Sequence, residues 1–232
     1  MSSLAARSTF LKITVLAAVV VAGAATLTQP VAAQDLAQDV LTPTVNVKNF
    51  SLHPNPKFIS CLGVPGNPAP TANVHVVRGN LNDTLTITGK NFKPGLAFDM
   101  FTVQRSNLRP NATVDPNFTN FGMAWYQSDL QADSDGSFST TIKTILLDQI
   151  FGFDPDQSNP APINTFHVGF WFNDPNDANV DGCTFDITHP TPFNGEHHAG
   201  PVAFISVPNS TTKLGPLCTN PNTSTVPASC NP

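Results

Sequence analysis

Three segments of the chain alternate apolar and polar residues with the period of two that is typical of half-buried β-strands. In residues 84–88, Leu85 and Ile87 fall on one face of such a strand and three threonines fall on the other. Residues 138–144 alternate in the same way, and residues 166–172 carry four apolar side chains at every second position. Because no stretch of ten residues shows a convincing helical period, the pattern predicts an all-β fold.

The charged residues support the same interpretation. They make up only 12% of the 232 residues, and Glu196 is the only Glu among 16 acidic residues. Surface helices are usually built from Glu, Lys and Arg, so a mainly helical protein is disfavoured. The hydrophobic content of 40% is enough for one core. Because 16 acidic residues outnumber 11 basic ones, we expect no nucleic-acid partner, which would need a basic face.

Four further segments have a less regular strand pattern, and turn residues separate them. They are residues 72–77, 96–103, 121–131 and 201–207. All seven segments together predict an immunoglobulin-like Greek-key β-sandwich of about seven strands over residues 72–207, with long loops. We expect two irregular flanks, a Pro/Asn-rich arm at 34–71 and a Ser/Thr/Pro-rich tail at 208–232. Removing the tail should leave the core folded, because it offers few apolar anchors.

Parts of this region resemble secreted bacterial immunoglobulin-like domains. The resemblance is carried by Thr-Gly-Lys-Asn-Phe-Lys-Pro-Gly within Thr84–Met100 and by Asp-Ser-Asp-Gly within Asp129–Ile142. With His167–Phe170 and Gly200–Ser206 added, the order of the segments is similar to that of the neocarzinostatin family of chromophore-carrier apoproteins. The resemblance implies a β-sandwich and a role in carrying a ligand.

The N-terminus has the pattern of a secretory signal peptide over residues 1–33. Arg7 and Lys12 precede an uncharged apolar run at 13–27, and Val31-Ala32-Ala33 is a small-residue cleavage pattern. The run is shorter than the roughly 20 residues that a membrane-spanning helix needs. We therefore expect a secreted, extracellular protein with no membrane span after signal cleavage.

Export changes how the cysteines are interpreted. Cys61, Cys183, Cys218 and Cys230 are an even number in an oxidising compartment, which predicts two disulfides. Three connectivities are open. We favour Cys218 with Cys230, which closes a small loop, and Cys61 with Cys183, which ties the N-terminal arm to a later loop.

Residues with functional chemistry concentrate in the long connection at 173–199. In the predicted topology this connection meets the turns at 89–95 and 133–136 at one end of the sandwich, and long loops are often functional. The acidic and histidine residues of the connection are Asp174, Asp177, Asp181, Asp186, Glu196, His189, His197 and His198. We expect a ligand to contact Trp171, Asp174 and Glu196 at this end.

One part of the connection suggests calcium. Asp177, Asn179 and Asp181, followed by Gly182, match the first half of an EF-hand-type loop, in which oxygen ligands alternate. The twelfth position is Thr188 where such a loop has a bidentate Glu. Asp, Asn and Gly are also ordinary turn formers, so a plain acidic loop stays open as the alternative.

The histidines suggest copper or zinc. His189, His197 and His198, together with an outward-facing His167 beside Trp171, would present imidazoles to such a metal. The spacing from Cys183 to His189 and on to His197 is similar to that of copper/zinc superoxide dismutases, which also have a Greek-key sandwich. Solvated surface histidines are the alternative.

Two functions from different classes follow. The favoured one is a secreted, non-catalytic module that binds an extracellular ligand or protein through the end formed by 89–95, 133–136 and 173–199. The other is a metal-dependent secreted enzyme that uses the histidines of 173–199. Catalysis is the weaker hypothesis, because the sequence has no Gly-x-Ser-x-Gly elbow and no His-Glu-x-x-His motif.

Overall fold

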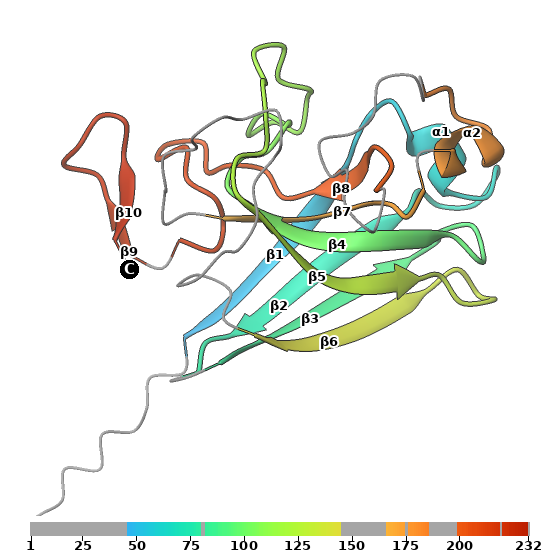
Figure 1. Cartoon of the computed structure of the whole chain (residues 1–232), viewed down its shortest axis with the longest axis horizontal. Helices are drawn as coiled ribbons and strands as arrows, with labels where there is room; N and C mark the ends of the chain where they lie inside the picture. The colour runs from blue at the N-terminus through green and yellow to red at the C-terminus, as the bar shows by residue number, and fades with distance from the viewer. Residues whose placement is uncertain are drawn as a thin grey trace, which may run out of the picture. The chain divides into compact units, whose positions relative to one another are not determined.

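Eight antiparallel strands form one sheet in the computed structural model, which describes residues 46–79, 82–144, 166–174, 176–185, 199–218 and 220–231 (Figure 1). The strands of the sheet are β1 (Val47–Pro54), β2 (Thr71–Val77), β3 (Asp83–Lys90), β4 (Ala97–Val103), β5 (Ala124–Gln131), β6 (Phe138–Thr144), β7 (His167–Phe172) and β8 (Val202–Ile205). Two short helices, α1 (Ile59–Leu62) and α2 (Asp177–Val180), and a separate hairpin of β9 (Asn220–Asn222) and β10 (Ser229–Asn231) complete the described elements. With 6% helix and 43% strand, the predicted all-β class is confirmed.

The strand order is β5-β4-β7-β8-β1-β2-β3-β6, and β1 joins its two halves. Residues 47–52 of β1 pair with β2, whereas His53 and Pro54 pair with β8. The edge strands β5 and β6 are consecutive in the chain, and a tight turn connects them. Gly136 in that turn has a φ of 75°, and a Cβ there would collide with the carbonyl of Phe92. The sheet therefore curls into a nearly barrel-shaped arrangement.

Phenylalanine rings fill the interior of the curled sheet. Phe92 lies at the centre of the cluster, and its ring centroid is 5.3–6.0 Å from those of Phe98, Phe138, Phe170 and Phe204. Such tilted and edge-on ring pairs stabilise a core beyond the area that they bury. The alternation of β3 is confirmed, because Leu85 and Ile87 are fully buried while the threonines that alternate with them are partly exposed.

A second apolar cluster covers the outer face of β4, β7 and β8. Its centre is Trp171, whose ring is edge-on to Phe101 and Phe121 at 5.2 and 5.1 Å. All six residues of β7 are buried, including His167 at 3% exposure. His167 lies on the outer face of β7 with Trp171, as predicted, but it is not exposed to solvent, because β4, β7 and β8 are covered on this face as well.

Each of the seven predicted strand segments contains a strand, but the flanks are more ordered than expected. β1 lies within the arm that we expected to be irregular, and β9 and β10 lie within the predicted tail. Lys48 occupies an inward position of β1, and its charge interrupts the apolar and polar alternation by which a strand is recognised in a sequence. Its Nζ donates a hydrogen bond of 2.7 Å to the carbonyl oxygen of Cys218 and so holds the C-terminal segment. Leu217, 1% exposed, also packs into the main core.

The two predicted disulfides are confirmed. Cys61 of α1 is bonded to Cys183, which follows α2, and Cys218 is bonded to Cys230 of β10. In the part of the chain that the structure describes, no helix has the length and apolar character to cross a membrane.

Candidate functional site

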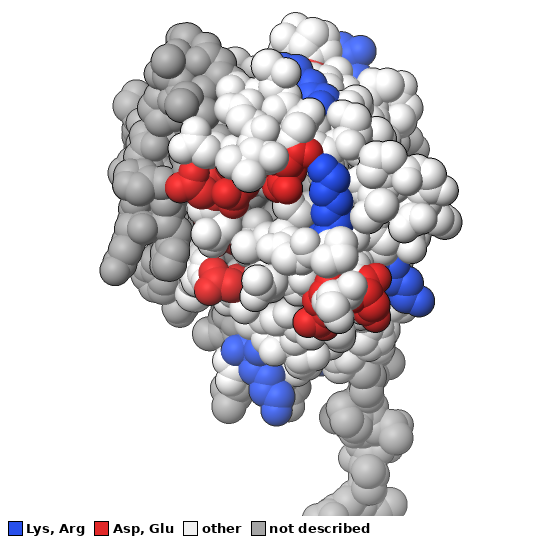
Figure 2. Space-filling view, turned by 90° about the vertical axis from the view of Figure 1, so that its right-hand side faces the viewer, with Lys and Arg blue, Asp and Glu red and all other residues white. Residues whose placement is uncertain are grey.

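The structure brings the three predicted connections together at one end of the sheet. The backbone N–H of Phe92 donates to the carbonyl of Gly136, 3.0 Å away, and so joins the β3–β4 and β5–β6 turns. Lys93 Nζ donates to the carbonyl of Asp181, at 2.5 Å, and so joins the first turn to α2. Figure 2 looks onto this end, where acidic side chains form several separate groups.

Burial and mutual repulsion act on the acidic residues of α2. Burial raises the pKa of Asp177, and the neighbouring charges of Asp174 and Asp181 raise it further. Burial also raises the pKa of Asp181, and the charge of Lys93 opposes this shift. The carboxylates are therefore close enough to repel one another, which is the electrostatic condition of a site that would favour a cation.

The residues of the predicted calcium loop do not converge on one point. Because residues 177–180 form a helical turn, Asp177 and Asp181 share one face and Asn179 lies on another. The amide of Asn179 is also engaged, since its Oδ1 accepts from the N–H of Phe185 and its Nδ2 donates to the carbonyl of the same residue. Among the described residues there is no group of three or more His, Cys, Asp or Glu side chains that could hold a metal ion.

The remaining predicted site residues separate into two groups. Trp171 is fully buried, so its ring has no exposed surface for a ligand, whereas Asp174 is exposed. The other residues fall outside the described part of the chain; they are His189, Glu196, His197 and His198. The copper or zinc site therefore stays a prediction.

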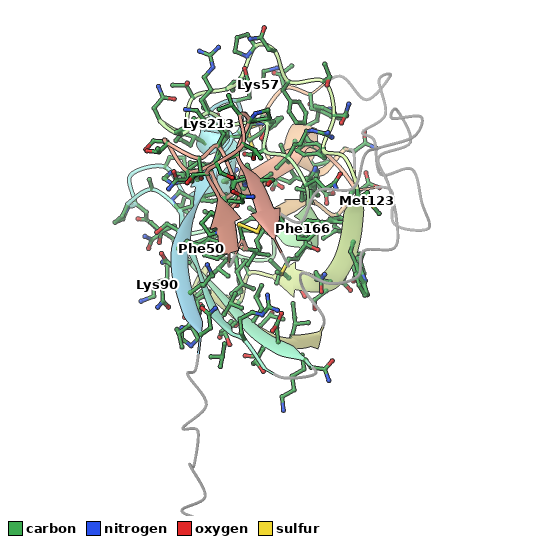
Figure 3. The ribbon with its side chains drawn as sticks, turned by 90° about the vertical axis from the view of Figure 1, so that its left-hand side faces the viewer. Phe50, Lys57, Lys90, Met123, Phe166 and Lys213 are labelled. Atoms are coloured by element: carbon green, nitrogen blue, oxygen red, sulfur yellow. A yellow bond between two sulfur atoms is a disulfide. The ribbon has the colours of Figure 1, made fainter. Side chains whose placement is uncertain are left out.

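A large cavity lies at the other end of the sheet, away from α1 and α2. Its volume is about 1020 Å³, whereas a depression on the outer face of β1, β2 and β3 measures about 270 Å³. The described lining comes from the β4–β5 loop (residues 104–123), from His167, and from the C-terminal segment (residues 208–231). Figure 3 looks onto this end, with Lys213 above the β9–β10 hairpin and Phe166 beside it.

The β4–β5 loop forms the first wall and is anchored on the second apolar cluster. Leu108 is 1% exposed and forms an isolated β-bridge with Val114. The ring of Phe118 packs at 4.6 Å on Phe121, which in turn contacts Trp171. These contacts anchor the loop on the outer face of β7.

The C-terminal segment forms the second wall and is cross-linked. Asn209 begins a tight turn in which its Oδ1 accepts hydrogen bonds from the N–H groups of Thr211 and Thr212. Lys213 follows in the left-handed region, with a φ of 63°. The buried side chains of Leu214 and Cys230 pack together, and the disulfide of Cys230 closes the loop.

His167 contributes to the floor of the cavity. Its Nδ1 lies 3.0 Å from both the carbonyl oxygen and the hydroxyl oxygen of Ser206. Burial lowers the pKa of His167 to about 4, and the hydrogen bond to the backbone of Ser206 opposes the shift only in part. The imidazole is therefore neutral at neutral pH, and the floor carries no charge there.

The rim of the cavity is basic. Arg105, Arg109 and Lys213 line it, and Asp115 is the one acidic residue in its described lining. Sequence reasoning missed this site because its walls are two loops without periodicity, brought together by the fold. The available signal was the length of the 104–123 connection together with its two arginines.

Comparison with known proteins gives no relative from which a role could be carried over. No family model matches the chain, and no curated protein and no solved structure matches it.

Proposed function

We propose that this protein is a secreted, non-catalytic module that binds a small extracellular ligand in the cavity between the β4–β5 loop and the C-terminal segment. The observation that carries the proposal is the cavity itself. Its volume of about 1020 Å³ is at the upper end of the range of small-molecule sites. Its described lining contains apolar side chains, among them Leu108, Phe118 and Leu214, together with twelve polar or charged residues, and polar groups of this kind fix the orientation of a bound ligand.

The chemistry of the lining favours binding over catalysis. A general base should have a pKa near the working pH, and His167, with a pKa of about 4, is far from that value. Asp115 is paired with Arg109. The two disulfides support the extracellular location, because such bonds persist in oxidising compartments.

The immunoglobulin-like sandwich belongs to the same proposal. One half of the sheet contains β1, β2, β3 and β6, and the other contains β4, β5, β7 and β8. We assign these halves to the two layers of a sandwich whose loops at one end form the binding site. This proposal keeps the class of function that the sequence predicts and moves the site to the opposite end of the fold.

The test is to map the binding of two small probes by nuclear magnetic resonance. Octanol is neutral, and octanoate has a similar chain with a carboxylate. We expect at least one probe to shift the amide signals of residues 104–120 and 208–218. Shifts confined to residues 91–95 and 176–183, or no specific shifts with either probe, would overturn the proposed function.

A blocking variant sharpens the test. Thr119 is exposed at the cavity, so Thr119→Trp should fill part of the cavity without disturbing the core and should weaken probe binding. Val180→Trp is the matched control, because Val180 is 82% exposed on α2 at the other end. The control should bind both probes as the unmodified protein does.

A further inference from the structure

The charge of the cavity is opposite to that of the chain. The formal net charge is −5 at pH 7, yet the described lining contains three basic residues and one acidic residue. A concave surface with one sign of charge concentrates ligands of the other sign. A basic cavity in an acidic protein therefore indicates the sign of the charge that the ligand carries.

Two of the three basic side chains keep hydrogen-bond donors for a ligand. Arg109 Nε is 3.5 Å from a carboxylate oxygen of Asp115, and the two side chains are 45% and 35% exposed. Exposed ion pairs of this kind contribute little to stability, so a ligand would compete with Asp115 at small cost. Lys213 Nζ donates to a neutral acceptor, the carbonyl of Ser210, at 2.6 Å.

The backbone of Lys213 has an uncommon conformation. Its φ of 63° places it in the left-handed region, where Gly or Asn is favoured over Lys. Strained positions of this kind concentrate at binding sites. Ala112 of the β4–β5 loop has a similar φ of 62°, so the conformation by itself assigns no role to the charge of Lys213.

The apolar part of the cavity completes the description of the ligand. Leu108, Phe118 and Leu214 belong to the lining; Phe118 is partly exposed, and Leu108 and Leu214 are 1% and 7% exposed. They would contact a hydrocarbon or aromatic group. We propose that the cavity selects a small amphipathic anion, with its acidic group between Arg109 and Lys213 and its apolar body against these three side chains. The guanidinium group suits a carboxylate, because its planar N–H groups form two parallel hydrogen bonds.

This inference rests on the proposed function, and the probes separate the two. Octanoate, octanol and octylamine have similar apolar chains and are anionic, neutral and cationic at pH 7. We expect octanoate to bind at least about tenfold more tightly than octanol, because charge-assisted hydrogen bonds are stronger than neutral ones. Octylamine should bind more weakly than octanol. Isothermal titration calorimetry gives the three affinities.

The variant that tests the site is Arg109→Gln with Lys213→Asn. Asn tolerates the left-handed conformation at position 213, so the fold should be kept. We expect octanoate affinity to fall to about that of octanol, while octanol affinity stays unchanged. The matched control is Lys57→Gln with Lys90→Gln, which removes two exposed charges that do not line the cavity and should leave octanoate binding unchanged.

Each outcome decides a different claim. Equal binding of octanoate and octanol in the cavity would overturn the preference for an anion and leave the proposed function standing. If none of the three probes binds there, both claims are overturned. The protein could also sediment with phosphatidylglycerol vesicles and lose this property in the double variant. That result would assign the anionic group to a membrane lipid and would overturn the proposal of a free small ligand.

Discussion

His167 of β7 and Ser206, the residue that follows β8, are joined by a hydrogen bond, with Nδ1 of the imidazole 3.0 Å from the carbonyl oxygen. The folded protein holds this imidazole in the neutral form, because burial lowers its pKa from 6.5 to about 4. In the unfolded chain the histidine has its ordinary pKa and takes up a proton earlier as the pH falls.

The first prediction concerns stability in acid. Between pH 6.5 and about 4 the unfolded state binds more protons at residue 167 than the folded state does, so the free energy of unfolding should decrease as the pH falls. The loss attributable to this residue is at most about 3 kcal/mol. Denaturant unfolding at several pH values measures it.

His167→Gln should flatten this part of the pH profile. Asp177 and Asp181 act in the opposite direction, since their pKa values are raised in the folded state and protonation there favours folding. The difference between the variant and the unmodified protein therefore isolates residue 167. If the free energies of unfolding of the variant and of the unmodified protein change in parallel with pH, the lowered pKa of His167 would be contradicted.

The second prediction concerns charge repulsion at α2. Asp181→Asn should raise the melting temperature slightly at pH 7, because an ionised carboxylate at this partly buried position is unfavourable. Solvent screening limits the gain to a few tenths of a kcal/mol. Asp135→Asn is the contrasting variant. Hydrogen bonds from Ser137 lower the pKa of Asp135, so removing this carboxylate should not raise the melting temperature. Calorimetry in chelator keeps cations out of the comparison, and a lower melting temperature for Asp181→Asn would contradict the prediction.

Much of the sheet was predictable, because a strand with one apolar face shows it in the sequence. Leu85 and Ile87 are an example, and the tight turn before β6 is another. β1 was missed because the inward Lys48 has a hydrogen-bond partner that only the fold supplies. Alternation placed His167 on the correct face of β7, but its burial was not predictable, because the segments that cover this face are far away in the sequence.

The candidate site was less predictable than the fold. The turns around Lys93 and Gly136 do meet as the topology implies. The cavity has no local signal, because its walls are separated by about 100 residues and meet only through tertiary contacts. Arg109 and Lys213 are unremarkable in the sequence and line one cavity only in the folded chain.

The third prediction compares the two disulfides. The Cys61–Cys183 bond spans 122 residues, and the Cys218–Cys230 bond spans 12. In the chain-entropy description, removing the first costs about 5 kcal/mol and removing the second about 3 kcal/mol. Replacing each pair by serines and measuring urea unfolding tests the order. A larger loss for the shorter loop would show that native contacts outweigh chain entropy.

The same variants separate stability from binding. The serine pair at 218 and 230 should lose octanoate affinity, because Cys230 lines the cavity. The pair at 61 and 183 should keep it under conditions in which the protein is folded. Equal affinities in both variants would mean that the cross-link does not shape the cavity.

The fourth prediction concerns residues 208–232, whose removal the sequence predicts to leave the core folded. Leu217→Ala should lower the free energy of unfolding by about 2–5 kcal/mol, as expected for a leucine in a core. Val226→Ala is the control from the same segment, because Val226 is fully exposed and should change stability by less than about 0.5 kcal/mol. A chain that ends at residue 207 should be clearly less stable than the full chain, and equal stability would contradict the docking of this segment.

The position of β1 between the two halves of the sheet has a consequence for how the chain folds. His53 pairs with Ile205, 152 positions later, so one side of β1 stays without its partner strand until β8 has formed. Pairings over such distances slow folding, and exposed strand edges promote aggregation in the meantime. We therefore expect refolding on the timescale of milliseconds to seconds that is typical of β-rich domains, with yields that fall as the protein concentration rises.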